Sequence, residues 1–214
     1  MIVDPLQMIV TTAFPGARLG IANGPVAAVE SRLNLVLPEP LKDFFSVAGR
    51  SRDILNADFR ILPPEKLRVD ADHLIFCEEN QGLEDFGIPL ESLQAARPDP
   101  QVDVRPLHAR SWTVEAPALS AFMLGMTAWQ VLLALPEKAR CLFPQDELNK
   151  LLALFEPVGA PQAQFEGPRF ALVDRRSSIV AAYEYTSGML YVGSPLEDVL
   201  DELGQKAGLD LDSL

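Results

Sequence analysis

Residues 29–49, VESRLNLVLPEPLKDFFSVAG, hold the joint from which the predicted fold develops. Proline is excluded from helix interiors, so the stretch predicts one helix that ends before Pro38 and a second that begins at Pro40. The apolar residues of the second helix recur at the i, i+3, i+4, i+7 spacing of one face: Leu41, Phe44, Phe45 and Ala48. Gly49 then suits a left-handed C-terminal cap. The stretch predicts two helices at a fixed angle and offers no catalytic group.

The residues before this joint favour a turn and a helix start. Asn23-Gly24-Pro25 is typical of a helix N-terminus, with Gly24 as the cap and Pro25 in the first turn. Glycines also stand at positions 16 and 20, which raises the alternative of a phosphate-binding loop. Neither a G-x-G-x-x-G pattern nor a G-K-S/T pattern is present, so we expect a flexible approach to the helix instead.

Short runs of branched and aromatic residues, bounded by Gly, Pro and Asn, predict strands after the joint. Five runs lie in the first half of the chain: 59–62, 74–77, 86–90, 102–104 and 112–114. Three more lie near the C-terminus: 170–173, 179–185 and 189–192. Strands and helices come in blocks rather than in strict alternation, which indicates an α+β fold.

Residues 116–136 carry no charge, and their length approaches that of a membrane span. Three polar residues dilute their apolar character: Ser120, Thr127 and Gln130. Prolines close both ends, and no basic cluster sets an orientation across a membrane. We therefore expect a helix that is buried between a sheet and other helices.

The C-terminal third predicts two more helices. One covers 145–156, and the other is opened by the Ser-Pro-Leu-Glu capping box at Ser194 and ended by Gly204. A Pro/Gly/Gln-rich linker, 157–168, separates them from each other and precedes the last three strands. The last ten residues are expected to form a loosely held tail.

These elements predict a single domain over residues 1–214. We expect a mostly antiparallel sheet of about six strands, flanked by helices. A meander and one helix, 157–214, would be only marginally stable alone because so short a segment buries little surface. We therefore expect this C-terminal part to dock on the same sheet.

The chain carries a net charge of −12, and the excess lies in two segments. Residues 76–103 hold seven acidic residues and one basic residue, and residues 151–214 hold ten and four. Such segments repel nucleic acid and anionic membranes, so neither is an expected partner, whereas a basic protein is. The alternative is a solvated acidic surface that serves solubility.

Cysteine usage points to a reducing compartment. Cys77 and Cys141 are too few for a disulfide scaffold, and both lie in apolar runs, so we expect buried free thiols. No secretory signal is visible at the N-terminus. We expect a cytoplasmic location.

The common catalytic and metal-binding patterns are missing from the sequence. Two cysteines and two histidines make a candidate zinc set: Cys77, Cys141, His73 and His108. No two of them stand at ligand spacing, so we expect neither a metal nor a cofactor. An anion site built from His108 and its neighbours Arg105 and Arg110 is a weaker alternative. We expect no catalytic residues.

Acidic residues gather around the predicted strand turns and make a candidate partner-binding rim: Glu78, Glu79, Glu84, Asp85, Asp99 and Asp103. Neighbours on a strand face opposite ways, so the pairs at 78–79 and 84–85 do not predict an acid/base pair. An enzyme that uses the carboxylates near Glu78 to Asp85 is one alternative, set beside the two binding hypotheses given below.

Several short motifs follow the helix–LP–helix joint, one after another along the chain: Phe59-Arg60-Ile61-Leu62-Pro63, Leu74-Ile75-Phe76 with Glu79-Asn80 and Gly82, Phe86-Gly87-Ile88, Asp99-Pro100-Gln101-Val102, Trp112, and Leu119 with Phe122. Their order and spacing over residues 26–135 resemble the SUKH superfamily, which includes bacterial immunity proteins and fungal cell-wall synthesis regulators. The resemblance implies an α+β domain with a sheet flanked by helices, and it implies no catalytic residues.

For bacterial members, the resemblance implies a protein that binds and blocks a cognate toxin, often a nuclease. The first hypothesis is therefore a non-enzymatic immunity protein that neutralises a basic toxin by direct binding. The alternative is a regulatory scaffold of a cellular complex that is unrelated to toxins.

Overall fold

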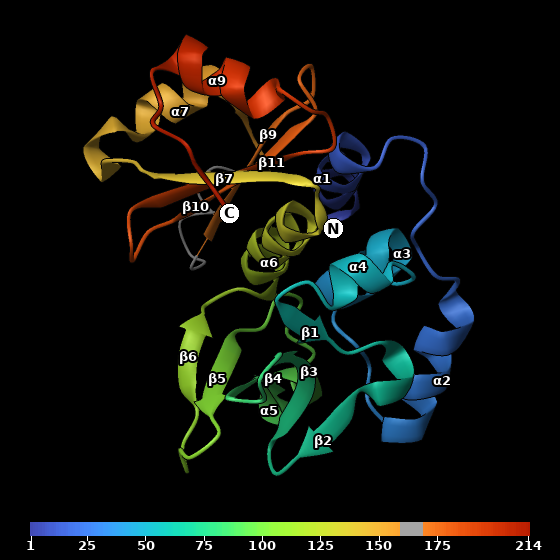
Figure 1. Cartoon of the computed structure of the whole chain (residues 1–214). Helices are drawn as coiled ribbons and strands as arrows, with labels where there is room; N and C mark the ends of the chain where they lie inside the picture. The colour runs from blue at the N-terminus through green and yellow to red at the C-terminus, as the bar shows by residue number, and fades with distance from the viewer. Residues whose placement is uncertain (159–168) are drawn as a thin grey trace.

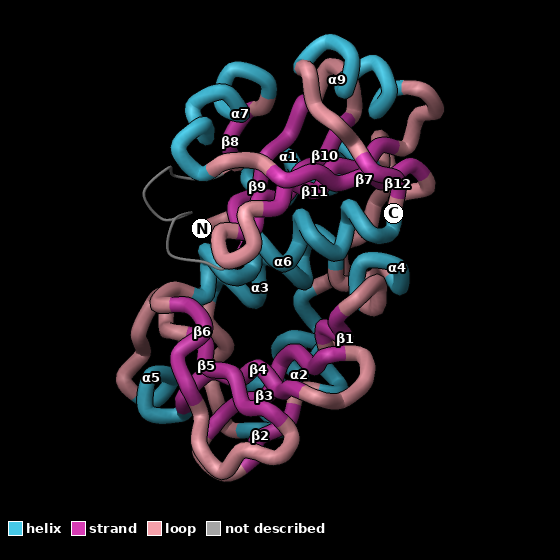
Figure 2. The backbone as a smooth tube through the Cα atoms, turned by 60° about the vertical axis from the view of Figure 1, so that its left-hand side comes forward, coloured by secondary structure: helices cyan, strands magenta, loops and turns pink. Residues whose placement is uncertain are grey.

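Helix α6 (Leu119–Ala134) runs through the centre of the molecule, between two antiparallel sheets (Figures 1 and 2). The computed structural model describes residues 1–158 and 169–214. Of the 16 residues of α6, 13 are buried, as expected for a helix that is apolar on all sides. Phe122 packs edge-on against Phe76 in one sheet, and Trp129 packs edge-on against Tyr191 in the other. The helix is therefore the layer that both sheets share.

The first sheet contains six strands in the order β1-β3-β4-β5-β6, with β2 paired to β3. Its strands are β1 (Phe59–Ile61), β2 (Arg68–Asp70), β3 (His73–Glu79), β4 (Glu84–Pro89), β5 (Val102–Pro106) and β6 (Thr113–Ala116). Five of the six follow the predicted runs closely, because those runs are rich in branched and aromatic residues. Helix α5 (Leu90–Gln94) continues directly from β4.

The second sheet has the strand order β12-β7-β11-β10-β9-β8. Its strands are β7 (Glu137–Leu142), β8 (Glu156–Pro157), β9 (Arg169–Asp174), β10 (Ile179–Glu184), β11 (Met189–Ser194) and β12 (Asp212–Ser213). The α+β fold is confirmed, but docking of the C-terminal meander on the first sheet is wrong. Strand β7 leaves α6 and pairs with β11, so the meander completes a sheet of its own on the other side of α6.

Helices α1 (Val3–Ala13), α3 (Glu39–Ala48) and α4 (Arg52–Leu55) share the central layer with α6, while α2 (Asn23–Leu33) lies at its edge (Figure 1). The joint is confirmed, since α2 ends before Pro38 and Pro40 lies in the first turn of α3. Gly49 ends α3 but is not a left-handed cap, because its φ is −62°. The left-handed cap in this region is Asn34, which ends α2 with a φ of 52°. Gly49 is needed for space instead, because a Cβ there would lie 2.7 Å from the carbonyl oxygen of Phe45.

The N-terminal approach to the joint is held in place by backbone contacts. The Ile21 N–H donates to the carbonyl of Phe45, and the Arg50 N–H donates to the carbonyl of Leu19. A Cβ on Gly20 would lie 1.7 Å from the carbonyl oxygen of Ser46, so only glycine fits there. The prediction of a flexible approach is wrong at this point.

The C-terminal part also differs from the prediction in its details. Helix α9 (Val199–Ala207) begins after Asp198, and the Ser194 hydroxyl accepts from the Leu196 N–H in a turn before the helix. The helix ends at left-handed Gly208 rather than at Gly204. The expected loose tail instead contains β12, which pairs with β7.

Along the chain between β7 and β8, the predicted helix at 145–156 is a short 3-10 turn followed by α7 (Leu148–Leu154). Most of the predicted linker, 159–168, lies outside the described residues. Helices α7 and α9 cover the outer face of the second sheet (Figure 2).

The Gln130 side chain fastens the segment before β1 to α6. Its amide nitrogen donates to the carbonyls of Ile54 at 2.8 Å and Phe59 at 2.5 Å. Its oxygen accepts from the N–H groups of Asp58 at 2.9 Å and Phe59 at 3.0 Å. One buried amide therefore satisfies four backbone groups of a segment more than 70 residues away in sequence.

Candidate functional site

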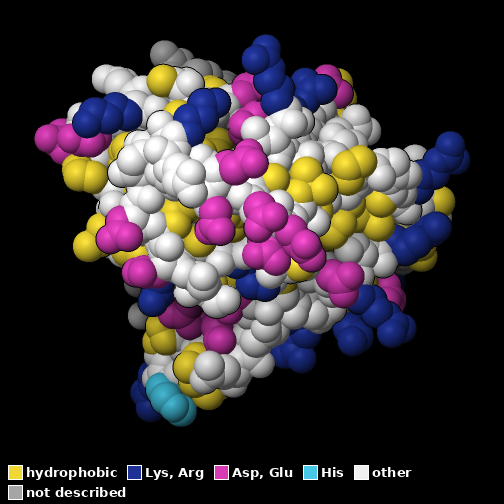
Figure 3. Space-filling view, turned by 45° about the horizontal axis from the view of Figure 1, so that its top comes forward, with side chains coloured by type: hydrophobic (Ala, Val, Ile, Leu, Met, Phe, Trp, Pro, Cys, Tyr) yellow, Lys and Arg dark blue, Asp and Glu magenta, His cyan; other side chains and the backbone are white. Residues whose placement is uncertain are grey.

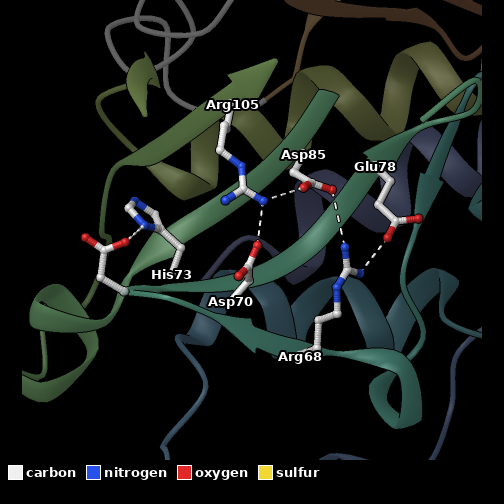
Figure 4. A network of polar contacts seen from close by, with 7 residues as sticks. Arg68, Asp70, His73, Glu78, Asp85 and Arg105 are labelled. Atoms are coloured by element: carbon white, nitrogen blue, oxygen red, sulfur yellow. Dashed lines mark hydrogen bonds and ion pairs between the residues drawn. The ribbon is translucent and has the colours of Figure 1, made fainter. Parts of the chain in front are cut away.

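A network of charged side chains crosses the first sheet on the face that is turned away from α6 (Figure 4). Residues opposite one another in the strand register supply it, because Arg60 pairs with Glu78 and Glu78 pairs with Asp85. Asp85 in turn lies opposite Arg105 on β5. Phe86, the next residue along β4, faces α6 instead, as the two-residue period of a strand requires.

Two arginines bridge the carboxylates of this network. Arg68 contacts Glu78 at 2.5 Å and Asp85 at 3.3 Å. Arg105 contacts Asp85 at 2.9 Å and Asp70 at 2.5 Å. Hydrogen bonds to Asp70 first, and to Asp85 second, raise the pKa of Arg105 above its ordinary value. The arrangement holds β2, β4 and β5 in register, and it leaves Asp85 with two cationic partners.

A buried histidine closes one end of the network. His73 Nδ1 lies 2.8 Å from Asp72 Oδ1, and Nε2 lies 3.0 Å from Asp103 Oδ2. Neutral imidazole carries one N–H, so both contacts are hydrogen bonds only when the ring is protonated. The hydrogen bond from His73 holds the pKa of Asp72 below its usual value. The Trp112 ring stacks on His73 with a centroid distance of 4.0 Å, and the Arg105 guanidinium lies 4.7 Å from the same Trp112 ring.

A small residue makes room for this stack. A Cβ added to Gly87 would lie 3.0 Å from the Cβ of His73 and 3.1 Å from the ring of Trp112. The Trp112 indole therefore lies across β4 at Gly87, because glycine has no side chain and lets the ring approach the backbone closely. The sequence predicted Trp112 as part of a strand at 112–114, and no spacing rule connects it to His73 or Gly87.

The structure divides the predicted acidic rim among three settings: Glu78, Asp85 and Asp103 in the network; Glu79 and Glu84 near the β3–β4 turn; and Asp99 before α6. Glu79 accepts from the N–H groups of Gln81 and Leu83, which shapes the turn. Asp99 accepts from the backbone N–H of Ser120 at 2.8 Å and thereby satisfies the start of α6. A partner-binding role for the rim stays a prediction, although three of its carboxylates already contact an arginine or histidine of this chain.

The zinc set is not assembled. Cys77 and Cys141 are free and buried, and they lie in different sheets. Among residues 1–158 and 169–214, no group of three or more His, Cys, Asp and Glu side chains is placed to hold a metal ion. Burial first, and the charges of Asp210 and Asp212 next, raise the pKa of the Cys141 thiol. The weaker anion alternative loses Arg105, whose guanidinium is turned toward Asp70 and Asp85.

A second acidic region, which we call the acidic end, lies on α9 and the segments that flank it. Six exposed carboxylates make it up: Glu197, Asp198, Asp201, Glu202, Asp210 and Asp212. Figure 3 looks onto this end of the molecule, where acidic side chains gather beside a hydrophobic area. Within the part of the chain that the structure describes, none of the six forms an ion pair. The charge of residues 151–214 signalled this acidity in the sequence, but not its concentration around one helix.

Beside the acidic end, an open groove of about 810 Å³ lies between α7, the end of β7 and the segment after α9. Its apolar lining includes Leu142, Phe143, Leu154, Met189 and Leu209. Leu142 on β7 is 76% exposed and adds a large apolar side chain to the surface of the groove. Acidic residues of the lining include Glu147, Asp210 and Asp212, and its basic residues are Arg140 and Lys150. Lys150 is already paired with Glu147 at 2.6 Å.

Comparisons with known proteins supply no family for this chain: no protein-family model, no curated protein and no solved structure matches it. Among the described residues, every helix is too short or too polar to cross a membrane. The arrangement of charge is therefore the main guide to function.

Proposed function

We propose that this chain is a non-enzymatic protein-binding module whose partner is a basic protein. We propose further that the partner is a toxin, and that the module neutralises it by covering its working surface. The observation that carries the proposal is the acidic end, whose six exposed carboxylates have no ion-pair partner among the described residues.

Unpaired surface carboxylates favour association with a cationic surface in two ways. They steer the encounter, because the potential of a cluster of like charges extends over about 8–10 Å at physiological salt. They also meet a basic partner without first breaking internal ion pairs, unlike Glu78 and Asp85, which are each held by arginine. The acidic end is therefore a better docking surface for a basic protein than the network on the first sheet.

The toxin part of the proposal draws on the resemblance of residues 26–135 to the SUKH superfamily. Along the chain, α2, the joint and α3 are followed by the strands of the first sheet and then by α6. The structure adds a second sheet with α7 and α9, and the acidic end belongs to this added part. We therefore place partner recognition on the second sheet and its helices.

Affinity capture with matched baits tests the binding proposal. The baits are the wild-type chain, the D201N/E202Q variant of the acidic end, and a D53N/E91Q control that removes two exposed charges elsewhere. We expect a basic protein on the wild-type and control baits and roughly tenfold less of it on D201N/E202Q. Equal recovery on all three baits, or no basic protein on any, contradicts the proposal.

Co-expression separates the toxin hypothesis from the scaffold alternative. Expression of the captured protein alone should arrest growth, and co-expression of the wild-type chain should restore it. A captured protein that is harmless alone favours the regulatory scaffold. Turnover of a substrate that depends on Glu78 or Asp85 would favour the enzyme hypothesis, which the ion pairs of these residues with Arg68 and Arg105 do not support.

A further inference from the structure

Resting on the proposed function, we infer that the partner contributes an extended segment that adds as a strand to the free edge of β7, inside the groove beside the acidic end. In that segment, apolar side chains alternate with basic ones. The inference depends on the backbone at the end of β7, on the lining of the groove and on the charge around it.

The edge of β7 is only partly covered by β12. The Leu214 N–H donates to the Lys138 carbonyl at 3.1 Å, so the backbone groups of Lys138 face β12. Alternate residues of an antiparallel strand direct their N–H and C=O to the same side, which places those of Arg140 and Leu142 on this edge too. Asp212 pairs with Arg140, but the register of β12 does not extend to Leu142. Within the described chain, Leu142 therefore has no strand partner on that side.

The groove occupies the place where a longer β12 would lie. Residues 209 and 210 line the groove where the chain has left α9 and has not yet paired with β7 as β12. A strand added beside Leu142 would place alternate side chains against Leu154 and Leu209. Its remaining side chains would lie near Asp210 and Asp212. An added strand would thus complete backbone hydrogen bonding and cover exposed apolar surface in one step.

Charge decides between the two occupants of such an edge. A second copy of this chain would bring another net charge of −12 to an acidic surface, which opposes self-association. A basic segment of another protein brings the opposite charge to Asp210 and Asp212. The geometry therefore points to a basic segment from a partner.

A synthetic peptide tests this inference. The probe is a short capped peptide in which valine and lysine alternate, titrated into the full-length protein at low and physiological salt. We expect amide chemical-shift changes at Leu142, Phe143, Leu209 and Asp210, and an affinity that falls as salt rises. A matched peptide of alternating valine and glutamate should not bind.

Two variants remove the two proposed interactions. Leu142→Pro deletes the N–H that faces the groove, at an edge position where proline is tolerated, and should weaken peptide binding roughly tenfold. D210N/D212N should weaken binding several-fold and flatten its salt dependence, which keeps the test decisive if Leu142→Pro unfolds. D53N/E91Q should bind as the wild type does.

Three results would overturn the inference: absence of peptide binding, shift changes confined to the exposed acids of α9, or wild-type affinity in both groove variants. The proposed function is tested separately by capture on D201N/E202Q. If capture requires those α9 acids while the groove variants capture normally, only the strand-addition inference fails.

Discussion

At two positions, a single residue joins segments that are distant in the sequence. Gly20 allows the N-terminal approach to lie against the end of α3, and Gln130 joins α6 to the segment before β1. Neither role is readable from local pattern. Gly20 stands in a row of spaced glycines, and Gln130 is one of the few polar residues in an apolar stretch.

Replacement of Gly20 by alanine should destabilise the protein by roughly 2–4 kcal/mol, because the new Cβ would overlap the backbone of Ser46. Gly24→Ala is the matched control, since nothing lies within 4 Å of a Cβ at that position. Urea denaturation measures both free energies of unfolding. Equal free energies for the two variants would show that the 19–21 segment does not hold this position.

Gln130→Leu should cost about 3 kcal/mol, because it leaves four backbone groups without their buried partner. Thr127→Val, one turn earlier, removes a hydroxyl that bonds only to the Met123 carbonyl of its own helix and should cost about 1 kcal/mol. Thermal unfolding of both variants gives the comparison. A smaller loss in Gln130→Leu than in Thr127→Val would contradict the fastening role.

At the scale of elements, the strands of the first sheet are linked by charge across their outer face. The links are not equivalent, since Arg105 lies inside the network and Arg60 lies at its end. Glu78 retains Arg68 if Arg60 is lost, whereas Asp70 loses its arginine and Asp85 keeps only one if Arg105 is lost.

Arg105→Met should therefore destabilise the protein by about 1–2 kcal/mol, and Arg60→Met by less than about 1 kcal/mol. The difference should shrink at high salt for the partly exposed pairs. Chemical denaturation at two salt concentrations measures it. The network account is wrong if Arg60→Met is the more damaging change.

The sequence predicts an element best where side chains of one kind are concentrated. The strands at 59–62 and 74–77 and the helix at 116–136 were predictable because their branched, aromatic or uncharged composition leaves few alternatives. Strand β7, with the mixed sequence EKARCL, was not predictable, because its partner on β11 lies far along the chain. The same long-range pairing decides that the meander forms a second sheet.

For the candidate site, the sequence predicted two acidic segments but not which of their carboxylates would meet a basic side chain. Glu78 and Asp85 acquire arginine partners only because β2, β3, β4 and β5 come together, which no local spacing reveals. The acids around α9 form no ion pair among the described residues, although Arg140 lies opposite Asp212 in the strand register and Lys206 lies on α9 itself.

At the scale of the whole molecule, the two sheets share one core. The cluster of buried residues around α6 includes Phe76 and Phe86 of the first sheet, and Val173 and Val180 of the second. Loss of either sheet would expose one side of α6, which is apolar all round. The molecule is therefore expected to unfold as a unit.

Unfolding in urea should follow one transition when observed by two probes. Tryptophan fluorescence reports on Trp112 beside the first sheet and on Trp129 in α6, and far-ultraviolet circular dichroism reports on the whole backbone. Coincident curves are the expected result. Two separated transitions would show that the second sheet and its helices fold independently of the first.

The central claim is that the acidic end binds a basic protein, and the affinity of the captured partner as a function of salt tests it most directly. For the wild-type chain, we predict that affinity falls roughly tenfold or more as salt rises through the physiological range. For D201N/E202Q, we predict weaker binding and a shallower dependence on salt. Affinity that is independent of salt, or identical in the wild type and D201N/E202Q, would contradict the claim.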